Sequence, residues 1–314
     1  PPRKADILLS MRRQNRVLEH AWADLTVTVE AGCTIAELQR TLAQHGQRLA
    51  VDPLWPERAT IGGILSTNDS GALRLGYGSL RDLIIGITLA LPDGTIASSG
   101  GKVVKNVAGY DLPKLATGAL GTLGVITRAV FRLHPLPHNT KTLTVAAEDE
   151  HEMQRVVSAI LGAQLAPAAV QVRKGNVDIL LEGTLDGIAA QESAINKFGN
   201  LREGSASVWN AREELWHERP VVKFTTLPSR IAEASASFSQ FVIQATGIGY
   251  ARFDGDLQGL RAAIEKDGGS LVTFGDTAID AWGSPGDAFP LMRAVKEQFD
   301  PKGTLNRGRF VGGI

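Results

Sequence analysis

The spacing of apolar residues predicts the first elements of the chain. From Leu25 to Glu30, apolar and polar positions alternate with period two, which is the pattern of a strand with one buried face. Over residues 35–42, apolar side chains recur at helical spacing. Thr34 and Glu37 form a capping box that can satisfy free N–H groups in the first turn, and Gly46 ends this helix.

Further strands and a short helix are expected in the same part of the chain. The apolar run Ile7-Leu8-Leu9 predicts a strand. Residues 83–91 and the residues after the turn sequence Pro92-Asp93-Gly94 predict a hairpin. A short helix is expected over residues 111–119, and a strand over 125–131 follows a Gly-rich turn.

The composition changes in the Pro-rich stretch 134–138, which is typical of a domain boundary. Beyond it, strands alternate with helices, as in an α+β layer whose helices cover one face of an antiparallel sheet. The strands are expected at 143–145, 170–172, 177–181 and 270–274, and the helices at 152–161, 257–264 and 289–299.

Residues 52–81 have little regular pattern and many Gly, Pro, Ser, Thr and Asn, and a loop of this length is usually functional. It contains Thr60-Ile61-Gly62-Gly63, followed by Thr67, Asn68 and Gly71. Paired glycines let backbone N–H groups turn toward an anion and let a phosphate come close. An ordinary tight turn has the same pattern, so both interpretations stay open.

A second Gly-rich segment spans residues 118–124. It precedes a strand and does not open a helix, so it does not fit the dinucleotide-binding fingerprint. A helix-to-strand turn and a ligand-binding loop are both compatible with it. Four basic residues lie near the Gly-rich segments in the sequence: Arg74, Arg81, Lys102 and Lys105. Their charges either neutralise a diphosphate or a small carboxylate of a ligand, or belong to the solvated surface.

Charge and composition exclude several other classes of protein. The 33 basic and 33 acidic residues cancel, which argues against nucleic acid as the main partner. Cys33 is the single cysteine, so it forms no internal disulfide and no metal cluster, and it is expected in the core. His134 and His138 lie in the Pro-rich stretch and are expected at the surface, not at a metal site.

Hydrolase chemistry and membrane insertion also lack support. The sequence has no Gly-x-Ser-x-Gly elbow, which serine hydrolases of the α/β type carry. It has no apolar run of about 18 residues, so no transmembrane helix is expected, and no signal peptide is recognised.

Taken in order, the segments resemble the vanillyl-alcohol-oxidase (PCMH) type of FAD-binding family. The resemblance covers nearly all of residues 7–135 and 286–312. It implies an α+β fold with a two-subdomain FAD-binding domain over 1–135, an inserted α+β cap domain over 136–285, and a C-terminal segment, 286–314, that returns to the FAD domain. The stretches that carry it are 60–63 with Asn68 and Gly71, Tyr77-Gly78 with Arg81-Asp82, 105–112, 121–127, 299–303 and 305–309.

The resemblance implies FAD as the cofactor, held mainly through the backbone of the two Gly-rich segments, and no metal. The residues that it assigns to FAD are Pro53, Thr60, Ile61, Gly62, Gly63, Thr67, Asn68, Gly71, Gly78, Gly118, Gly121, Thr122, Gly124, Ile126 and Asn306.

Within that family, the stretch 105–112, Lys-Asn-Val-Ala-Gly-Tyr-Asp-Leu, is most similar to the E subunits of bacterial glycolate oxidases. This likeness implies a multi-subunit complex that oxidises glycolate, a 2-hydroxy acid, to glyoxylate. The implied partners are a catalytic D-type subunit and an iron–sulfur subunit. The implied location is cytoplasmic, with peripheral attachment at the inner membrane through the complex.

Three departures from the family pattern bear on catalysis. A Gly-rich pyrophosphate loop ahead of Ile7 is missing from this sequence. Val104 and Ala108 stand where catalytic relatives have an Arg and a Thr that grip the substrate carboxylate, and an apolar side chain cannot pair with a carboxylate. No histidine follows His217, where those relatives carry a metal motif.

We therefore hypothesise a subunit that binds FAD and supports assembly or electron transfer, with its catalytic residues unassigned. Two alternatives remain open. One is a stand-alone FAD-dependent alcohol or 2-hydroxy-acid dehydrogenase, and the other is a non-catalytic scaffold that has lost the flavin.

Overall fold

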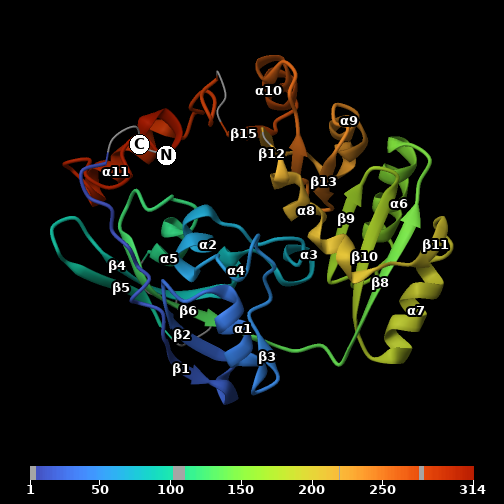
Figure 1. The fold of residues 1–314 in the computed structure, drawn as a ribbon, viewed down its shortest axis with the longest axis horizontal. Coiled ribbons are helices and arrows are strands. Elements are labelled where there is room, and N and C mark those ends of the chain that lie inside the picture. The colour runs from blue at the N-terminus through green and yellow to red at the C-terminus, as the bar shows by residue number, and fades with distance from the viewer. Residues whose placement is uncertain (1–4, 102–109, 219, 276–278) are drawn as a thin grey trace. The chain divides into compact units, whose positions relative to one another are not determined.

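The computed structural model describes residues 5–101, 110–218, 220–275 and 279–314, which form two compact units (Figure 1). The first unit combines the residues up to Gly71 with Gly78–Leu136 and Ser284–Ile314. The second unit contains Ala72–Tyr77 and Pro137–Gly283. Each unit has its own sheet and its own hydrophobic core.

A five-stranded antiparallel sheet forms the centre of the first unit, in the order β1-β2-β6-β4-β5. The predicted strand at 25–30 and the predicted hairpin after residue 83 are confirmed. The strands are β1 (Val17–Ala21), β2 (Thr26–Glu30), β4 (Ile84–Ala90), β5 (Ile96–Gly100) and β6 (Val125–Arg132), and a separate pair joins β3 (Gln47–Arg48) to β7 (His134–Pro135).

Helix α1 (Ile35–Ala43) forms as the sequence predicts and packs its apolar side into the core. The Thr34 hydroxyl accepts the N–H of Glu37 at 3.2 Å, but the Glu37 carboxylate pairs with Arg40 at 2.6 Å. Gly46 follows the helix with a φ of +64°. The other helices of this unit are η1 (Trp22–Asp24), α2 (Ile61–Thr67), α4 (Leu80–Leu83), α5 (Leu112–Ala116), α11 (Phe289–Phe299) and η5 (Val311–Gly313).

The strand predicted at Ile7-Leu8-Leu9 is wrong. These side chains are 86%, 93% and 63% exposed, and the segment joins no sheet within the described residues. A strand requires a neighbour for its N–H and C=O groups, and an apolar run does not reveal whether one is available. Cys33, in contrast, is fully buried in the core, as expected.

The segment 52–81 is more regular than its composition indicates. It contains three short helices, α2, α3 (Arg74–Tyr77) and α4. Gly62 and Gly63 lie inside α2, although glycine is a poor helix former. Intrinsic propensity therefore predicted a loop where tertiary contacts impose a helix.

The second unit is built on an eight-stranded sheet in which all neighbouring strands are antiparallel, in the order β11-β8-β10-β9-β13-β14-β12-β15. The strands are β8 (Asn139–Ala146), β9 (Ala169–Arg173), β10 (Asn176–Gly183), β11 (Asn200–Glu203), β12 (Val221–Thr225), β13 (Phe241–Gln244), β14 (Ile248–Arg252) and β15 (Ser270–Phe274).

Four helices cover one face of this sheet, as the α+β prediction requires. Figure 1 shows α6 and α7 beside strands β8 to β10. A smaller apolar cluster of Leu215, Val242 and Tyr250 includes side chains from the opposite face. The covering helices are α6 (Glu150–Gly162), α7 (Leu185–Ile195), α9 (Ile231–Ser235) and α10 (Leu257–Lys266), and the short ones are η2 (Ala206–Asn210), α8 (Ala211–Glu214), η3 (Leu215–His217) and η4 (Pro228–Arg230).

The short segment Ala72–Tyr77 leaves the first unit and joins the second. The Gly76 N–H donates to the Ala168 carbonyl at 3.1 Å, and the Tyr77 hydroxyl donates to Glu182 at 2.6 Å. Gly71 and Gly78 at its two ends have φ angles of +73° and +84°. Among the described residues, no helix is both long and apolar enough to cross a membrane.

Candidate cofactor site

The first Gly-rich segment forms the start of α2, which lies against the turn between β2 and α1. The Thr60 hydroxyl accepts the N–H of Gly63 at 3.2 Å. The N–H of Ile61 donates to the Cys33 carbonyl at 2.9 Å, and that of Gly62 to the Ala31 carbonyl at 2.7 Å. These bonds satisfy three donors that a helix start normally leaves open.

The expectation that these amides turn toward an anion is therefore wrong, because protein acceptors already hold them. The glycine at position 62 instead permits close packing: a Cβ there would lie 3.0 Å from the Ala31 Cβ. Thr60, Ile61, Gly62 and Gly63 thus fix the position of α2.

The two Gly-rich segments, which are 50 residues apart in the sequence, meet at the C-terminal end of α2. The N–H of Gly118 donates to the Leu65 carbonyl at 2.8 Å, and the N–H of Leu120 donates to the Ser66 carbonyl at 2.9 Å. A Cβ at Gly118 would lie 3.4 Å from the Asn68 Cβ. Tertiary structure therefore places the two sequence motifs in one site.

Asn68 combines two unusual features at this junction. It ends α2 in the left-handed region, with a φ of +51°, where asparagine is tolerated better than most residues. Its side-chain oxygen, Oδ1, is buried and accepts no hydrogen bond from the described residues. An unsatisfied buried acceptor costs about 1–3 kcal/mol, so its retention points to a ligand donor.

Arg81 supplies a positive charge beside the same glycine. Its Nε and Nη2 donate to the Thr117 carbonyl at 3.2 and 2.8 Å. Nη2 lies 3.6 Å from the place where a Cβ of Gly118 would stand. The guanidinium is thus held in position by a neutral carbonyl, so its charge is available to an anionic or carbonyl group of a ligand.

Gly71 brings the chain close to residues 52–53. The N–H of Asp52 donates to the Ser70 carbonyl at 3.2 Å. A Cβ on Gly71 would stand 2.1 Å from the Asp52 carbonyl oxygen, so only glycine fits. Pro53 is buried next to this contact. Gly78 precedes α4, where Asp82 Oδ2 accepts the N–H of Ser79 at 2.8 Å.

Four of the residues predicted to bind FAD already contact other parts of the protein through their side chains or at Cα. The Thr67 hydroxyl donates to the Gly63 carbonyl at 3.0 Å, and the Thr122 hydroxyl donates to the Ala119 carbonyl at 2.7 Å. Ile126 belongs to the hydrophobic core. A Cβ on Gly124 would lie 3.3 Å from the Leu89 Cβ. Any contact of Thr67, Thr122 or Ile126 with a ligand is therefore left mainly to the backbone.

The C-terminal segment reaches the second Gly-rich segment through Asn306. Its Nδ2 donates to the Leu120 carbonyl at 2.7 Å, across 186 positions of sequence. Lys296 and Asp300, which sequence reasoning missed, hold this contact. Their four-residue separation at the end of α11 could have revealed this ion pair, because residues at i and i+4 are neighbours on a helix.

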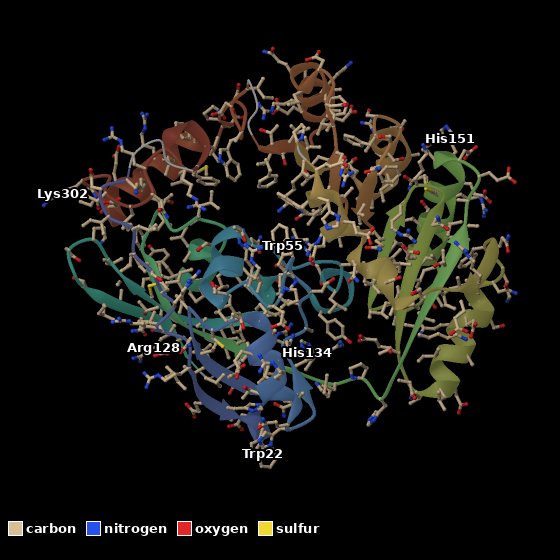
Figure 2. The ribbon with its side chains drawn as sticks, viewed as in Figure 1. Trp22, Trp55, Arg128, His134, His151 and Lys302 are labelled. Atoms are coloured by element: carbon tan, nitrogen blue, oxygen red, sulfur yellow. The ribbon has the colours of Figure 1, made fainter. Side chains whose placement is uncertain are left out.

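Several expectations fall outside the part of the chain that the structure describes. They concern Lys102 and Lys105 as cations and Val104 and Ala108 as replacements for substrate-binding residues. Arg74 lies on α3 in the second unit. Figure 2 shows His134, which belongs to β7, and His151, which belongs to α6, and no group of three metal-ligating side chains occurs among the described residues.

The residues at this site fit the FAD that the resemblance implies. Gly118, with a φ of +87°, leaves room for close approach, because a Cβ there would come no closer than 3.4 Å to its neighbours. The orphaned Asn68 oxygen matches an N–H or O–H donor, and Arg81 matches a carbonyl or phosphate oxygen. FAD carries groups of all these kinds.

Comparison with known proteins agrees with this site. The family described as "FAD binding domain" matches residues 2–100, and the family described as "FAD linked oxidases, C-terminal domain" matches residues 284–310. The second match includes Asn306, and the first match ends before Leu120, the residue whose carbonyl Asn306 binds. The chain is a flavoprotein with FAD as its cofactor, and its matched segments are similar to FAD-linked oxidases.

Two relatives are informative for different reasons. Glycolate oxidase subunit GlcD of Bacillus subtilis is 36% identical over 170 residues, which are 54% of this chain and 36% of that protein. This chain thus matches little more than a third of GlcD. Glycolate oxidase subunit GlcE of Escherichia coli is 26% identical over 325 residues, which cover 96% of this chain and 86% of GlcE.

Solved structures support the fold. Alkyldihydroxyacetonephosphate synthase superposes with a TM-score of 0.69 and 20% sequence identity, covering 96% of this chain and 68% of the synthase. At that level of identity, the match establishes a shared PCMH-type architecture and nothing about the substrate.

Proposed function

We propose that this chain is the FAD-binding, E-type subunit of a multi-subunit glycolate oxidase that converts glycolate to glyoxylate. The observation that carries the proposal is the extent of its similarity to GlcE, which spans 86% of that subunit. The similarity to GlcD is higher in identity but covers 36% of that subunit. The chain therefore matches an E-type subunit along its length and a D-type subunit only in part.

Glycolate oxidation removes two electrons and two protons: one hydrogen leaves the carbon that bears the hydroxyl group, and the other leaves the hydroxyl oxygen. FAD, when bound, supplies the two-electron acceptor for this reaction. Thr60, Ile61, Gly62 and Gly63 position α2. We assign the other eleven predicted residues to FAD binding, with close backbone approach at Gly118. Asn68 Oδ1 accepts a hydrogen bond from FAD, and Arg81 places positive charge beside the cofactor.

The residue types near the proposed site favour a helper role for this chain, in which another subunit oxidises glycolate. Abstraction of a proton from a 2-hydroxy acid needs a positioned base, most often histidine. Residues 52–126 and 296–306 contain no histidine. The D-type subunit then oxidises the substrate, the iron–sulfur subunit carries electrons onward, and this chain supports assembly or electron transfer at a cytoplasmic, membrane-peripheral complex.

One observation favours the alternative of a stand-alone dehydrogenase. The chain is also similar to a protein that is not named as a subunit: D-lactate dehydrogenase of Archaeoglobus fulgidus is 32% identical over 179 residues, which are 57% of this chain. A stand-alone enzyme would reduce its flavin with an alcohol or a 2-hydroxy acid and without a partner.

Flavin content and substrate-dependent bleaching separate these functions. The chain is purified alone and after co-expression with a D-type subunit and an iron–sulfur subunit, and the flavin absorbance is followed on adding glycolate, D-lactate or a neutral alcohol. We expect co-purification, bound FAD in both preparations, and bleaching by glycolate only in the complex. Steady turnover of any of these substrates by the flavin-loaded chain alone would contradict the helper role.

A further inference from the structure

The segment Ala72–Tyr77, here called the tether, is the part of the chain between Gly71 and Gly78 that belongs to the second unit. Its two ends are held close together in the first unit, because the buried Ser70 hydroxyl accepts the N–H of Leu80 at 3.0 Å. Gly71 and Gly78 are among the residues that we assign to FAD. The tether therefore begins and ends in the candidate cofactor site.

Close packing fixes both ends of the tether. A Cβ on Gly71 would stand 2.1 Å from the Asp52 carbonyl oxygen, and a Cβ on Gly78 would stand 2.9 Å from the Asp82 Cβ. The Asp82 carboxylate also accepts the N–H and the hydroxyl of Ser79, at 2.8 and 2.7 Å. Because closely packed groups transmit strain, a displacement of the tether is passed to the residues at its two ends.

Three contacts hold the tether on the second unit. The Leu75 side chain packs against the core of that unit. The Gly76 N–H donates to the Ala168 carbonyl at 3.1 Å, and a Cβ on Gly76 would stand 3.0 Å from the same oxygen. The Tyr77 hydroxyl donates to Glu182 Oε2 at 2.6 Å, a distance typical of a hydrogen bond to a charged acceptor.

Both polar contacts end on one part of the eight-stranded sheet. The N–H of Ala168 donates to the Leu180 carbonyl of β10 at 2.8 Å, and Glu182 lies two residues further along the same strand. Strand β10 pairs with β8 on one side and with β9 on the other. The tether is thus anchored to an interior strand, so its position follows that of the sheet.

We propose that docking of the tether on the second unit sets the positions of Asn68, Gly71 and Gly78 for FAD binding. Tyr77 and Glu182 are then positioning residues, which act through the chain and not through contact with the cofactor. The inference rests on the proposed assignment of those three residues to FAD and deepens it, because it makes FAD affinity depend on contacts in the second unit. Substitutions that leave the three docking contacts in place leave the affinity unchanged.

The test removes the hydrogen bond between Tyr77 and Glu182. Tyr77→Phe deletes the donor and keeps the ring, and Glu182→Leu deletes the acceptor. Glu192→Leu removes a carboxylate that pairs with Lys141 elsewhere in the second unit and serves as the matched control. FAD affinity is measured by quenching of flavin fluorescence, and hydrogen exchange of the Gly76 amide is measured with and without FAD.

Coupling between docking and FAD binding is reciprocal, so bound FAD must favour docking if docking favours FAD. We therefore expect FAD to slow exchange at the Gly76 amide, which we do not assign to FAD, and Tyr77→Phe to speed it. We expect Tyr77→Phe to weaken FAD binding about three- to tenfold, which is less than the full effect of the lost bond on docking, because Leu75 and Gly76 still hold the tether. Glu192→Leu should bind FAD as the wild type does.

A double-mutant cycle checks that Tyr77 acts through Glu182. In the Glu182→Leu background, Tyr77→Phe should cause no further loss of FAD affinity. An undiminished loss in that background would overturn the pairing of the two residues. Unchanged exchange of the Gly76 amide on FAD binding would overturn the proposal, as would wild-type affinity in Tyr77→Phe.

These outcomes are separable from failure of the proposed function. Failure of the partner subunits to co-purify would contradict the glycolate oxidase assignment and leave the measurements on the tether unaffected. A wild-type chain without affinity for FAD would overturn both.

Discussion

At the scale of single residues, backbone conformation and side-chain burial select the residue types at the site. Asn68 pairs a φ of +51° with a buried oxygen that lacks a partner. Gly71 has a φ of +73° and no space for a Cβ. Gly71 is therefore the residue type that its backbone and its neighbours require, whereas Asn68 departs from ordinary packing, and we propose that a ligand donor accounts for its oxygen.

Asn68→Gly is expected to raise the stability of the FAD-free chain and to lower its affinity for FAD. Glycine removes the left-handed strain and the unsatisfied oxygen, so the FAD-free chain should gain about 0.5–1 kcal/mol. Loss of the acceptor should weaken FAD binding about tenfold. Urea unfolding without FAD and fluorescence titration with FAD measure the two effects, and unchanged affinity would exclude Asn68 as a contact.

Gly71→Ala is expected to be far more damaging than the same change at Gly94. Both glycines have positive φ angles, +73° and +89°, so both variants carry the strain of about 1 kcal/mol for an alanine there. At Gly71 the new Cβ also meets the Asp52 carbonyl oxygen at 2.1 Å, whereas Gly94 has nothing within 4 Å. Urea unfolding should show a loss of more than about 2 kcal/mol for Gly71→Ala alone, because residues 52–53 must move.

At the scale of elements, the end of α11 and the turn after it form one hydrogen-bonded unit. Burial by itself would raise the pKa of Asp300, but the hydrogen bonds from Lys296, Leu305 and Thr304 outweigh it and lower the pKa from 3.8 to about 2. Because the folded value lies below the ordinary one, the stabilisation is complete above about pH 4 and is lost as the pH falls toward 2.

Acid should therefore release residues 300–306 only at low pH. Hydrogen exchange of the Leu305 amide between pH 5 and 2 measures this release, after correction for the intrinsic pH dependence of exchange. We expect the protection factor to stay constant above pH 4 and to fall below it. The variant Asp300→Asn should lack this dependence, and an equal fall in the variant would contradict the assigned cause.

At the scale of the whole molecule, two separate cores carry the two units. The core of the first unit includes Leu38 and Phe131, and that of the second includes Val172 and Ile188. All the residues that we assign to FAD lie in the first unit. Stability and cofactor binding are therefore expected to respond differently to core substitutions in the two units.

Leu38→Ala and Ile188→Ala test this separation. Each removes a buried aliphatic side chain and should cost about 2–5 kcal/mol of unfolding free energy in its own unit. We expect Ile188→Ala to leave the FAD dissociation constant within about twofold, since distant sites behave additively. Calorimetry and FAD titration measure both quantities. A tenfold loss of affinity in Ile188→Ala would show that the second unit controls the FAD site.

Local patterns predicted several elements correctly. The alternation over 25–30, the helical spacing over 35–42 and the amphipathic stretch 289–299 appear as β2, α1 and α11. The prediction was wrong at Ile7-Leu8-Leu9, which requires a neighbouring strand, and it missed α2. The start of α2 depends on carbonyls of Ala31 and Cys33, nearly 30 residues away in sequence.

For the candidate site, residue types alone indicated the segments that we assign to FAD. The two Gly-rich stretches, Asn68 and Asn306 are recognisable because positive φ angles and close approach restrict residue type at each position. Their contacts come from the fold. It satisfies the amides of 61–63 with two carbonyls and the Thr60 hydroxyl, leaves the Asn68 oxygen without a partner among the described residues, and joins Asn306 to the Leu120 carbonyl. The direction of an N–H group depends on partners that are distant in sequence, and local patterns carry no information about them.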